Sequence, residues 1–158
     1  MKALSLIQPY ATLIMLGYKQ YETRSWDTKH RGPLAIHASV GKPAWAREVA
    51  ETDPHISVIL AQHGLTFDTL PRGAVLGTVE VLGTYRFVET PTDGQGKPSL
   101  VPRTLPTVEL ACGDFTSGRY GWKLRKSGEL AKPIPCKGAL SVWTLPPEVA
   151  QELQQLGI

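Results

Sequence analysis

Apolar and polar residues alternate over six short stretches of the chain, and a period of two is typical of half-buried β-strands. These stretches cover residues 3–7, 18–25, 33–39, 73–87, 119–124 and 139–145. Glycine and proline stand between most of them, as expected for turns. Gly83 lies inside the longest stretch and predicts a bulge or bend there.

Apolar residues three or four positions apart predict short helices between and after these strands. Pro9 is placed as the first residue of one helix and Gly17 as its stop. Further helices are expected over residues 43–51, 53–63 and 147–156. Residues 89–118 are rich in Pro, Gly, Thr and Ser, so they predict a long surface loop with some local order around residues 108–111. The pattern favours a single α+β domain over residues 1–158, built on a mostly antiparallel β-barrel of about six strands with short flanking helices.

The composition is that of an ordinary globular protein, with 42% hydrophobic and 20% charged residues. The net charge of +3 is a mild bias toward anionic partners. Cys112 and Cys136 show no metal-ligand or CxxC spacing, so free thiols in a reducing compartment are expected. The apolar N-terminal run is interrupted at Gln8-Pro9, and no stretch is long enough to span a membrane. We expect a cytoplasmic monomer that does not enter a membrane.

Several familiar kinds of site are missing from the sequence. It has no GxGxxG or P-loop for a nucleotide cofactor and no GxSxG for an acyl-transfer serine. The four histidines have no spacing that would hold zinc together with Asp or Cys. We therefore expect neither a cofactor nor a metal.

The most informative stretch is residues 17–26, GYKQYETRSW, which places Lys19, Glu22, Arg24 and Trp26 within one short segment. Such a mixture is typical of a site lining, and also of a sheet edge whose charges pair with one another. The strand period predicts that Glu22, Arg24 and Trp26 share one face and that Thr23 points to the other. Lys19 can join Glu22 only if it belongs to the turn after the helix.

Five segments, in order, resemble the ASCH domain, a family named after activating signal cointegrator 1. They are LSLIQPYATLIMLGYKQYETRSW, HRGPLAIHAS, AVLGTVEV, GDFTSGRYGWKL and PIPCKGALSVW, and together they run from Leu4 to Trp143. The most specific parts match GxKxxExR and GRYGW. The resemblance is to a single-domain member of bacterial or phage type, and it implies a PUA-like fold with a cleft of about nucleotide width. Members of this family are generally thought to bind RNA or other nucleic acids.

The resemblance implies a cleft that holds Lys19, Glu22 and Arg24, with walls from HRGPLAIHAS and from the GRYGW strand. Single-stranded nucleic acid needs cations for its phosphates and flat side chains for its bases. A carboxylate such as that of Glu22 can accept from an exocyclic amine of a base. We expect Trp45 and Trp143 in the core, whereas Trp122 is a candidate for either core packing or stacking. The candidate nucleic-acid-binding residues are Lys19, Glu22, Arg24, Ser25, Trp26, Lys29, His30, Arg31, His37, Ser39, Arg119 and Tyr120.

A hydrolase is the alternative, with Lys19 and Glu22 as candidate catalytic residues. Some small members of the family resemble an amidohydrolase that removes the acyl group of N4-acetylcytidine with a Lys, a Thr nucleophile and a Glu. The Lys matches Lys19, but Glu22 stands at the Thr position, and a carboxylate does not replace that hydroxyl in the usual scheme. Other members are reported as ribonucleases, in which Lys19 would stabilise the phosphorane. The expected partner is RNA or a nucleotide, with DNA left open.

Overall fold

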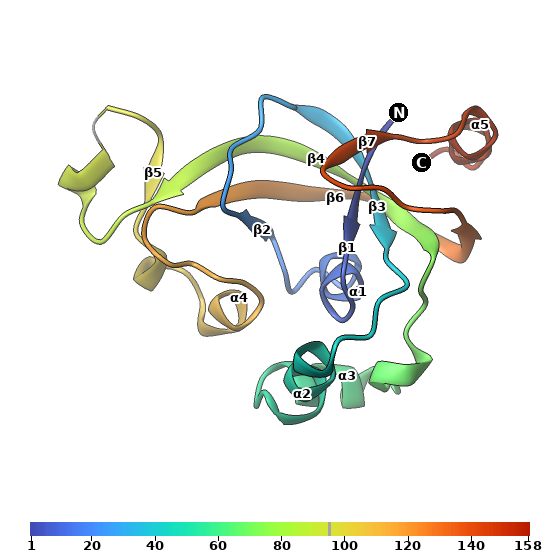
Figure 1. Ribbon diagram of the computed structural model, residues 1–158, viewed down its shortest axis with the longest axis horizontal. Helices are drawn as coiled ribbons and strands as arrows, with labels where there is room; N and C mark the ends of the chain where they lie inside the picture. Colours follow the sequence, from blue (N-terminus) through green and yellow to red (C-terminus); the bar gives the residue numbers. More distant parts are fainter. Residues whose placement is uncertain (95) are drawn as a thin grey trace.

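The computed structural model describes residues 1–94 and 96–158, which form one curved sheet with helices at both of its ends (Figure 1). Seven strands are described, in the order β2-β6-β4-β3-β1-β7, and β5 pairs with β4 outside this path. The strands are β1 (Lys2–Leu6), β2 (Tyr21–Arg24), β3 (Gly32–Ala38), β4 (Ala74–Phe87), β5 (Ser99–Leu100), β6 (Tyr120–Pro135) and β7 (Val142–Thr144).

The long strands β4 and β6 form the centre of the sheet, and their pairing is antiparallel. The β1–β3 and β4–β5 pairs are parallel, whereas the other described pairs are antiparallel. The β4–β6 register shifts between Val81 and Gly83, so the bulge predicted at this glycine is confirmed. The shifts let the two strands bend together, and a bent sheet can wrap around a core.

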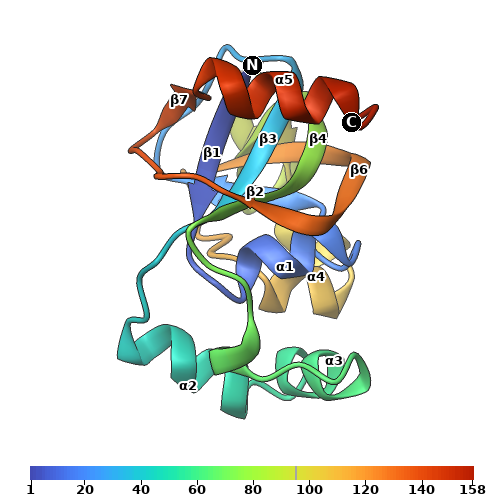
Figure 2. The same ribbon diagram turned by 90° about the vertical axis from the view of Figure 1, so that its right-hand side faces the viewer.

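Helix α1 (Tyr10–Met15) fills the concave side of the sheet, where Ile14 and Met15 pack with Ile36 and Trp122. A second cluster joins Leu13 to a lower layer of α2 (Ala44–Thr52), α3 (Ile56–Gln62) and η1 (Phe67–Thr69). A third cluster packs α5 (Pro147–Gln155) over the opposite end (Figure 2). The remaining elements are η2 (Pro91–Gly94), η3 (Pro102–Thr104) and α4 (Thr107–Ala111).

The mixed α+β class and the mostly antiparallel sheet predicted from the sequence are confirmed. Residues 89–118 differ from the expectation of one long loop, because η2, β5, η3 and α4 divide this segment. Strand β6 also continues to Pro135, well beyond the predicted end at residue 124. None of the described helices has the length and apolar character that crossing a membrane requires.

Candidate functional site

A cavity of about 980 Å³ opens beside the C-terminal end of β1. Five segments far apart in the sequence contribute to its wall: β1 with the start of α1, the turn into β2, the end of β3 with α2, the α4–β6 connection, and the β6–β7 connection. This volume lies within the range of small-molecule sites, which is about 300–1,000 Å³. The cavity is therefore large enough to admit a nucleotide.

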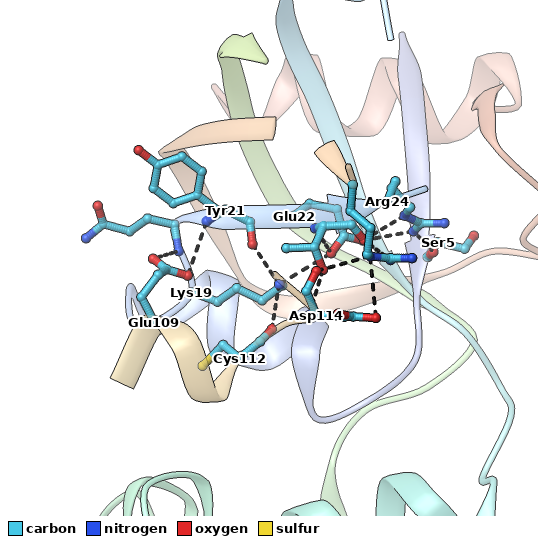
Figure 3. A network of polar contacts seen from close by, with 11 residues as sticks. Ser5, Lys19, Tyr21, Glu22, Arg24, Glu109, Cys112 and Asp114 are labelled. Carbon is cyan, nitrogen blue, oxygen red and sulfur yellow. Dashed lines mark hydrogen bonds and ion pairs between the residues drawn. The ribbon is translucent and has the colours of Figure 1, made fainter. Parts of the chain in front are cut away.

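The carboxylate of Glu22 lies at the wall of this cavity between two cations (Figure 3). Its Oε2 accepts hydrogen bonds from Arg24 Nε at 3.1 Å and Nη2 at 2.9 Å. Its Oε1 accepts from the backbone N–H of Thr23 at 3.1 Å and lies 3.4 Å from Lys19 Nζ. The strand period predicted that Glu22 and Arg24 meet, and this contact is confirmed. A carboxylate offers about four acceptor positions, so these partners leave Glu22 little capacity for a ligand.

The ammonium of Lys19 is almost completely enclosed, with 1% of the side chain exposed. It donates to the carbonyl oxygen of Tyr21 at 2.7 Å and to that of Cys112 at 2.6 Å, and Glu22 is its third partner. Lys19 lies in the turn after α1, as the sequence required for it to reach Glu22. Two of the three N–H donors of this ammonium are used by the carbonyl oxygens, and Glu22 balances its charge as an ion pair.

Arg24 has a different environment, because 26% of its side chain is exposed. Its Nη2 also donates to the carbonyl oxygen of Ser5 at 3.2 Å, so Nε and Nη2 are both engaged. Within residues 1–94 and 96–158, Nη1 has no hydrogen-bond partner. Glu22 thus fixes one edge of the guanidinium, and the donors of Nη1 are available for a ligand.

His37 borders the cavity with both of its ring nitrogens engaged. Nε2 lies 2.7 Å from the carbonyl oxygen of Cys136, which must accept, so Nε2 carries the proton. Nδ1 then accepts from the hydroxyl of Ser5 at 3.0 Å, and Ser5 in turn accepts from Trp143 Nε1. Burial lowers the pKa of His37, partly opposed by the bond to Cys136. His37 is therefore a neutral structural residue in this arrangement.

An aromatic pair forms another part of the wall. The rings of Tyr10 and Trp45 stack at a centroid separation of 6.3 Å and an interplanar angle of 28°. Trp45 is 54% exposed, so the expectation that it belongs to the core is wrong. It projects from α2, whose buried positions are Ala46 and Ala50. An exposed indole at a cavity wall offers a stacking surface for a flat ring.

The α4–β6 connection supplies Asp114 and Arg119. Asp114 is held by the Thr116 hydroxyl and backbone N–H, and these bonds lower the pKa of its carboxyl group, assisted by Arg119. From the β6–β7 connection, Lys137 contributes an exposed side chain whose ammonium has no partner in the described part of the chain. Lysine and arginine contribute four cations to the lining, and glutamate and aspartate contribute two anions. The cavity therefore favours an anionic ligand.

Both cysteines are free and border the cavity, as Cys112 and Cys136. Burial raises the pKa of the Cys112 thiol to about 11, and burial also raises the pKa of Cys136. Neither is set up as a thiolate nucleophile. Among the residues that the structure describes, no three His, Cys, Asp or Glu lie together as metal ligands would.

The structure brings half of the predicted binding residues to the cavity, namely Lys19, Glu22, Arg24, His37, Ser39 and Arg119. The other half lies outside its lining, namely Ser25, Trp26, Lys29, His30, Arg31 and Tyr120. Arg31 bonds to the carbonyl oxygens of Thr28 and His30 and to the hydroxyl of Thr84, which fixes its own loop.

Trp26, one of the predicted binding residues, packs on another tryptophan instead of lining the cavity. Trp26 sets its ring edge-on to Trp122 at 4.9 Å, and Trp122 is fully buried, so Trp122 belongs to the core. Sequence reasoning missed Tyr10, Trp45 and Lys137. No signal in the sequence pointed to Trp45, because an apolar pair such as Trp45 and Val49, four positions apart, is typical of a buried helix face. Thr23 borders the cavity too, although the strand period assigned it to the other face of β2.

Comparison with known proteins gives the family. The model of the ASCH domain matches residues 4–98, more than half of the chain. The chain belongs to the ASCH domain family. Activating signal cointegrator 1 from Homo sapiens and from Mus musculus are each 37% identical to it over 79 residues. These matches cover 50% of this chain but 13% of either relative, so this ASCH domain corresponds to a small part of those proteins.

Solved structures with the same fold include the ASCH protein from Zymomonas mobilis. It superposes with a TM-score of 0.54 at 16% identity, covering 98% of this chain and 94% of that chain. A form of that protein with one substituted residue gives a TM-score of 0.53 at 16% identity, covering 98% and 96%. At this identity the likeness establishes the fold, and the PUA-like architecture expected of the family is confirmed.

Proposed function

We propose that this ASCH domain binds one nucleotide of a single-stranded RNA in its cavity. The observation that carries the proposal is the free Nη1 edge of Arg24, which Glu22 holds in place at the wall of a cavity of nucleotide size. A guanidinium oriented by a carboxylate is well suited to a phosphate or carbonyl oxygen, because its remaining donors keep a fixed direction.

Other residues of the cavity wall would contribute further contacts to the bound nucleotide. Arg119 and Lys137 add positive charge to the lining from two separate connections, where it would attract the phosphates of a bound strand. Trp45 gives the base a stacking surface, extended by Tyr10. Glu22 was expected to accept from a base amine, but its acceptor positions are occupied, so we assign base or phosphate contact to Arg24 instead. Ser39 and His37 complete the wall nearest β3.

The geometry gives hydrolysis less support than binding. Two donors of Lys19 are used by backbone carbonyl oxygens, its charge is paired with Glu22, and its side chain is 1% exposed, so this lysine is poorly placed to reach a phosphorane or a nucleophile. Both nitrogens of His37 are engaged, which leaves no open general base there. The proposal is therefore binding without turnover. Incubating the protein with a labelled RNA and with an N4-acylated cytidine tests this part, and product formation in either reaction would contradict it.

Binding itself is tested by fluorescence anisotropy with a short labelled RNA of mixed sequence, titrated at several salt concentrations. We expect the affinity to fall with salt and Trp45→Ala to weaken binding by roughly 1–3 kcal/mol, the usual loss when one base loses its aromatic partner. The control is Val58→Ala, because Val58 is similarly exposed at 52% but lies on α3 outside the cavity. Absence of binding at low salt, or equal effects of both substitutions, would contradict the proposal. A DNA strand of the same sequence decides between the two nucleic acids.

A further inference from the structure

Lys19 connects two parts of the molecule that are far apart in the sequence. Its Nζ lies on the β2 side, where it bonds to the carbonyl oxygen of Tyr21 and approaches Glu22. The same ammonium donates at 2.6 Å to the carbonyl oxygen of Cys112, the C-cap of α4 (Figure 3). Carbonyl groups at the end of a helix have no partner within the helix, so a buried cation there is a strong anchor.

Glu109 of α4 makes the reciprocal connection. Glu109 is 5% exposed, and its carboxylate accepts from the backbone N–H of Gln20 at 2.7 Å and, more weakly, from that of Tyr21 at 3.4 Å. Burial raises the pKa of Glu109, opposed by the bond from Gln20 and by the charge of Lys19. Glu109 itself does not line the cavity. The turn into β2 and helix α4 are thus joined by two buried charges, one from each side.

The residues that follow α4 form a cavity wall. Gly113 packs so closely on Thr23 that a Cβ at this position would lie 2.9 Å from the threonine side chain. The backbone N–H of Asp114 donates to the Thr23 hydroxyl at 3.1 Å, and Arg119 Nε donates to the carbonyl oxygen of Asp114 at 3.1 Å. The orientation of the Arg119 side chain at the cavity is therefore tied to the segment after α4, while its carbonyl oxygen accepts from the N–H of Phe87 in β4.

We propose that Lys19 is a positioning residue, which together with Glu109 locks α4 against β2 and so builds the wall that carries Asp114 and Arg119. Lys19 then takes no part in ligand contact, although it lies at the cavity and matches the lysine of the GxKxxExR motif. This inference deepens the proposed function and rests on it only for the binding measurement below.

The first test needs no ligand. Hydrogen exchange of backbone amides is compared between the unmodified protein and Lys19→Met. We expect exchange in residues 109–119 to become faster by roughly tenfold or more, because the charge-assisted hydrogen bond from Lys19 to the carbonyl oxygen of Cys112 is lost. Glu109→Gln should give the same local signature, and it keeps the inference testable if Lys19→Met does not fold. Unchanged exchange in both variants would overturn the inference.

The second test uses Lys137→Met as a matched control, the same substitution at an exposed cavity lysine that has no partner in the described part of the chain. For a single strand, each lost phosphate contact lowers the slope of log affinity against log salt by about 0.7. We expect Lys137→Met to lower the slope by this amount and to leave amide exchange unchanged. Lys19→Met should weaken binding of the labelled RNA and also speed amide exchange in residues 109–119.

A lowered slope for Lys19→Met with unchanged amide exchange in residues 109–119 would make Lys19 a phosphate ligand and overturn the inference. If the unmodified protein binds no RNA, the proposed function fails, whereas the exchange comparison still decides the positioning of α4. The two hypotheses can therefore fail separately.

Discussion

At the scale of single residues, Glu22 holds the cavity wall together, because it is the shared partner of Lys19 and Arg24. Glu22→Gln removes the charge that both cations require and leaves one carbonyl oxygen in place of two carboxylate oxygens. We expect a loss of roughly 1.5–3 kcal/mol in the free energy of unfolding, the usual value for hydrogen bonds to charged groups. Urea unfolding measures it.

Glu80→Gln is the matched control for this prediction. Glu80 pairs with Arg125 on the outer surface, and 67% of the arginine side chain is exposed. Exposed ion pairs contribute about 0–1 kcal/mol, so this variant should stay close to the unmodified protein. If the two substitutions lowered the free energy of unfolding equally, the burial of Glu22 would make no contribution to stability, and the prediction would be wrong.

His37 makes the stability depend on pH. Burial lowers its pKa in the folded protein, whereas in the unfolded chain it takes up a proton near the ordinary value of about 6.5. Below that pH the unfolded chain binds more protons, so stability falls as the pH drops from about 6.5 toward the folded pKa. His37→Gln can keep the bonds to Ser5 and Cys136 and cannot titrate. We expect its unfolding midpoint in urea to fall less on acidification, and parallel curves for both proteins would contradict this.

At the scale of elements, the crossing of β4 and β6 depends on Gly77. A Cβ at this position would collide with the carbonyl oxygen of Gly128 and come within 2.6 Å of Met15 Sδ, so neither the strand nor α1 leaves room for it. Gly77→Ala should cost roughly 1–3 kcal/mol of stability, as overpacking does. In the same strand, the nearest atom to a Cβ at Gly83 is 3.7 Å away on Tyr85, so Gly83→Ala is the control. A similar loss at both positions in thermal unfolding would contradict the steric explanation.

Elements with a clear period could be predicted from the sequence. The β1, β3 and β4 strands and helix α5 lie close to their predicted bounds, because one face of each is apolar and buried. The second half of β6 reads RKSGELAKPIP, and most of its side chains up to Lys132 are exposed. No alternation marks such a strand, since its pairing with β4 rather than burial holds it in place. The local order predicted around residues 108–111 is helix α4, but its attachment could not be predicted, because its anchor Lys19 lies 93 positions before Cys112.

The candidate site shows the same division. Glu22 and Arg24 are two positions apart on one strand, so their contact follows from local geometry. Trp45 and Lys137 reach the cavity only through the way α2 and the β6–β7 connection pack around β1. The local sequence pattern of α2 or of the β6–β7 connection carries no information about which distant segment it packs against. Contacts between residues close together in the sequence can therefore be predicted, whereas the residues brought to the cavity by tertiary packing are identified only from the structure.

At the scale of the whole molecule, the chain carries a net charge of +3, and the cavity gathers four cations against two anions. A ligand that contacts both the cations and the Tyr10–Trp45 pair should stabilise the folded state more than one that contacts either alone. At about 100 times its dissociation constant, a ligand adds about 2.7 kcal/mol. For a chain of this size that corresponds to a rise in Tm of about 5–10 °C.

Thermal unfolding with nucleoside monophosphates, nucleosides and inorganic phosphate at equal concentration separates these contributions. We expect the monophosphates to raise the Tm most, because only they join a base for Trp45 to a phosphate for Arg24, Arg119 or Lys137. Trp45→Ala should reduce the shift from a monophosphate to that from phosphate alone. If phosphate alone matches the monophosphates, the cavity is a simple anion site. If nucleosides match them, the cations of the cavity take no phosphate, and the excess of positive charge there requires another explanation.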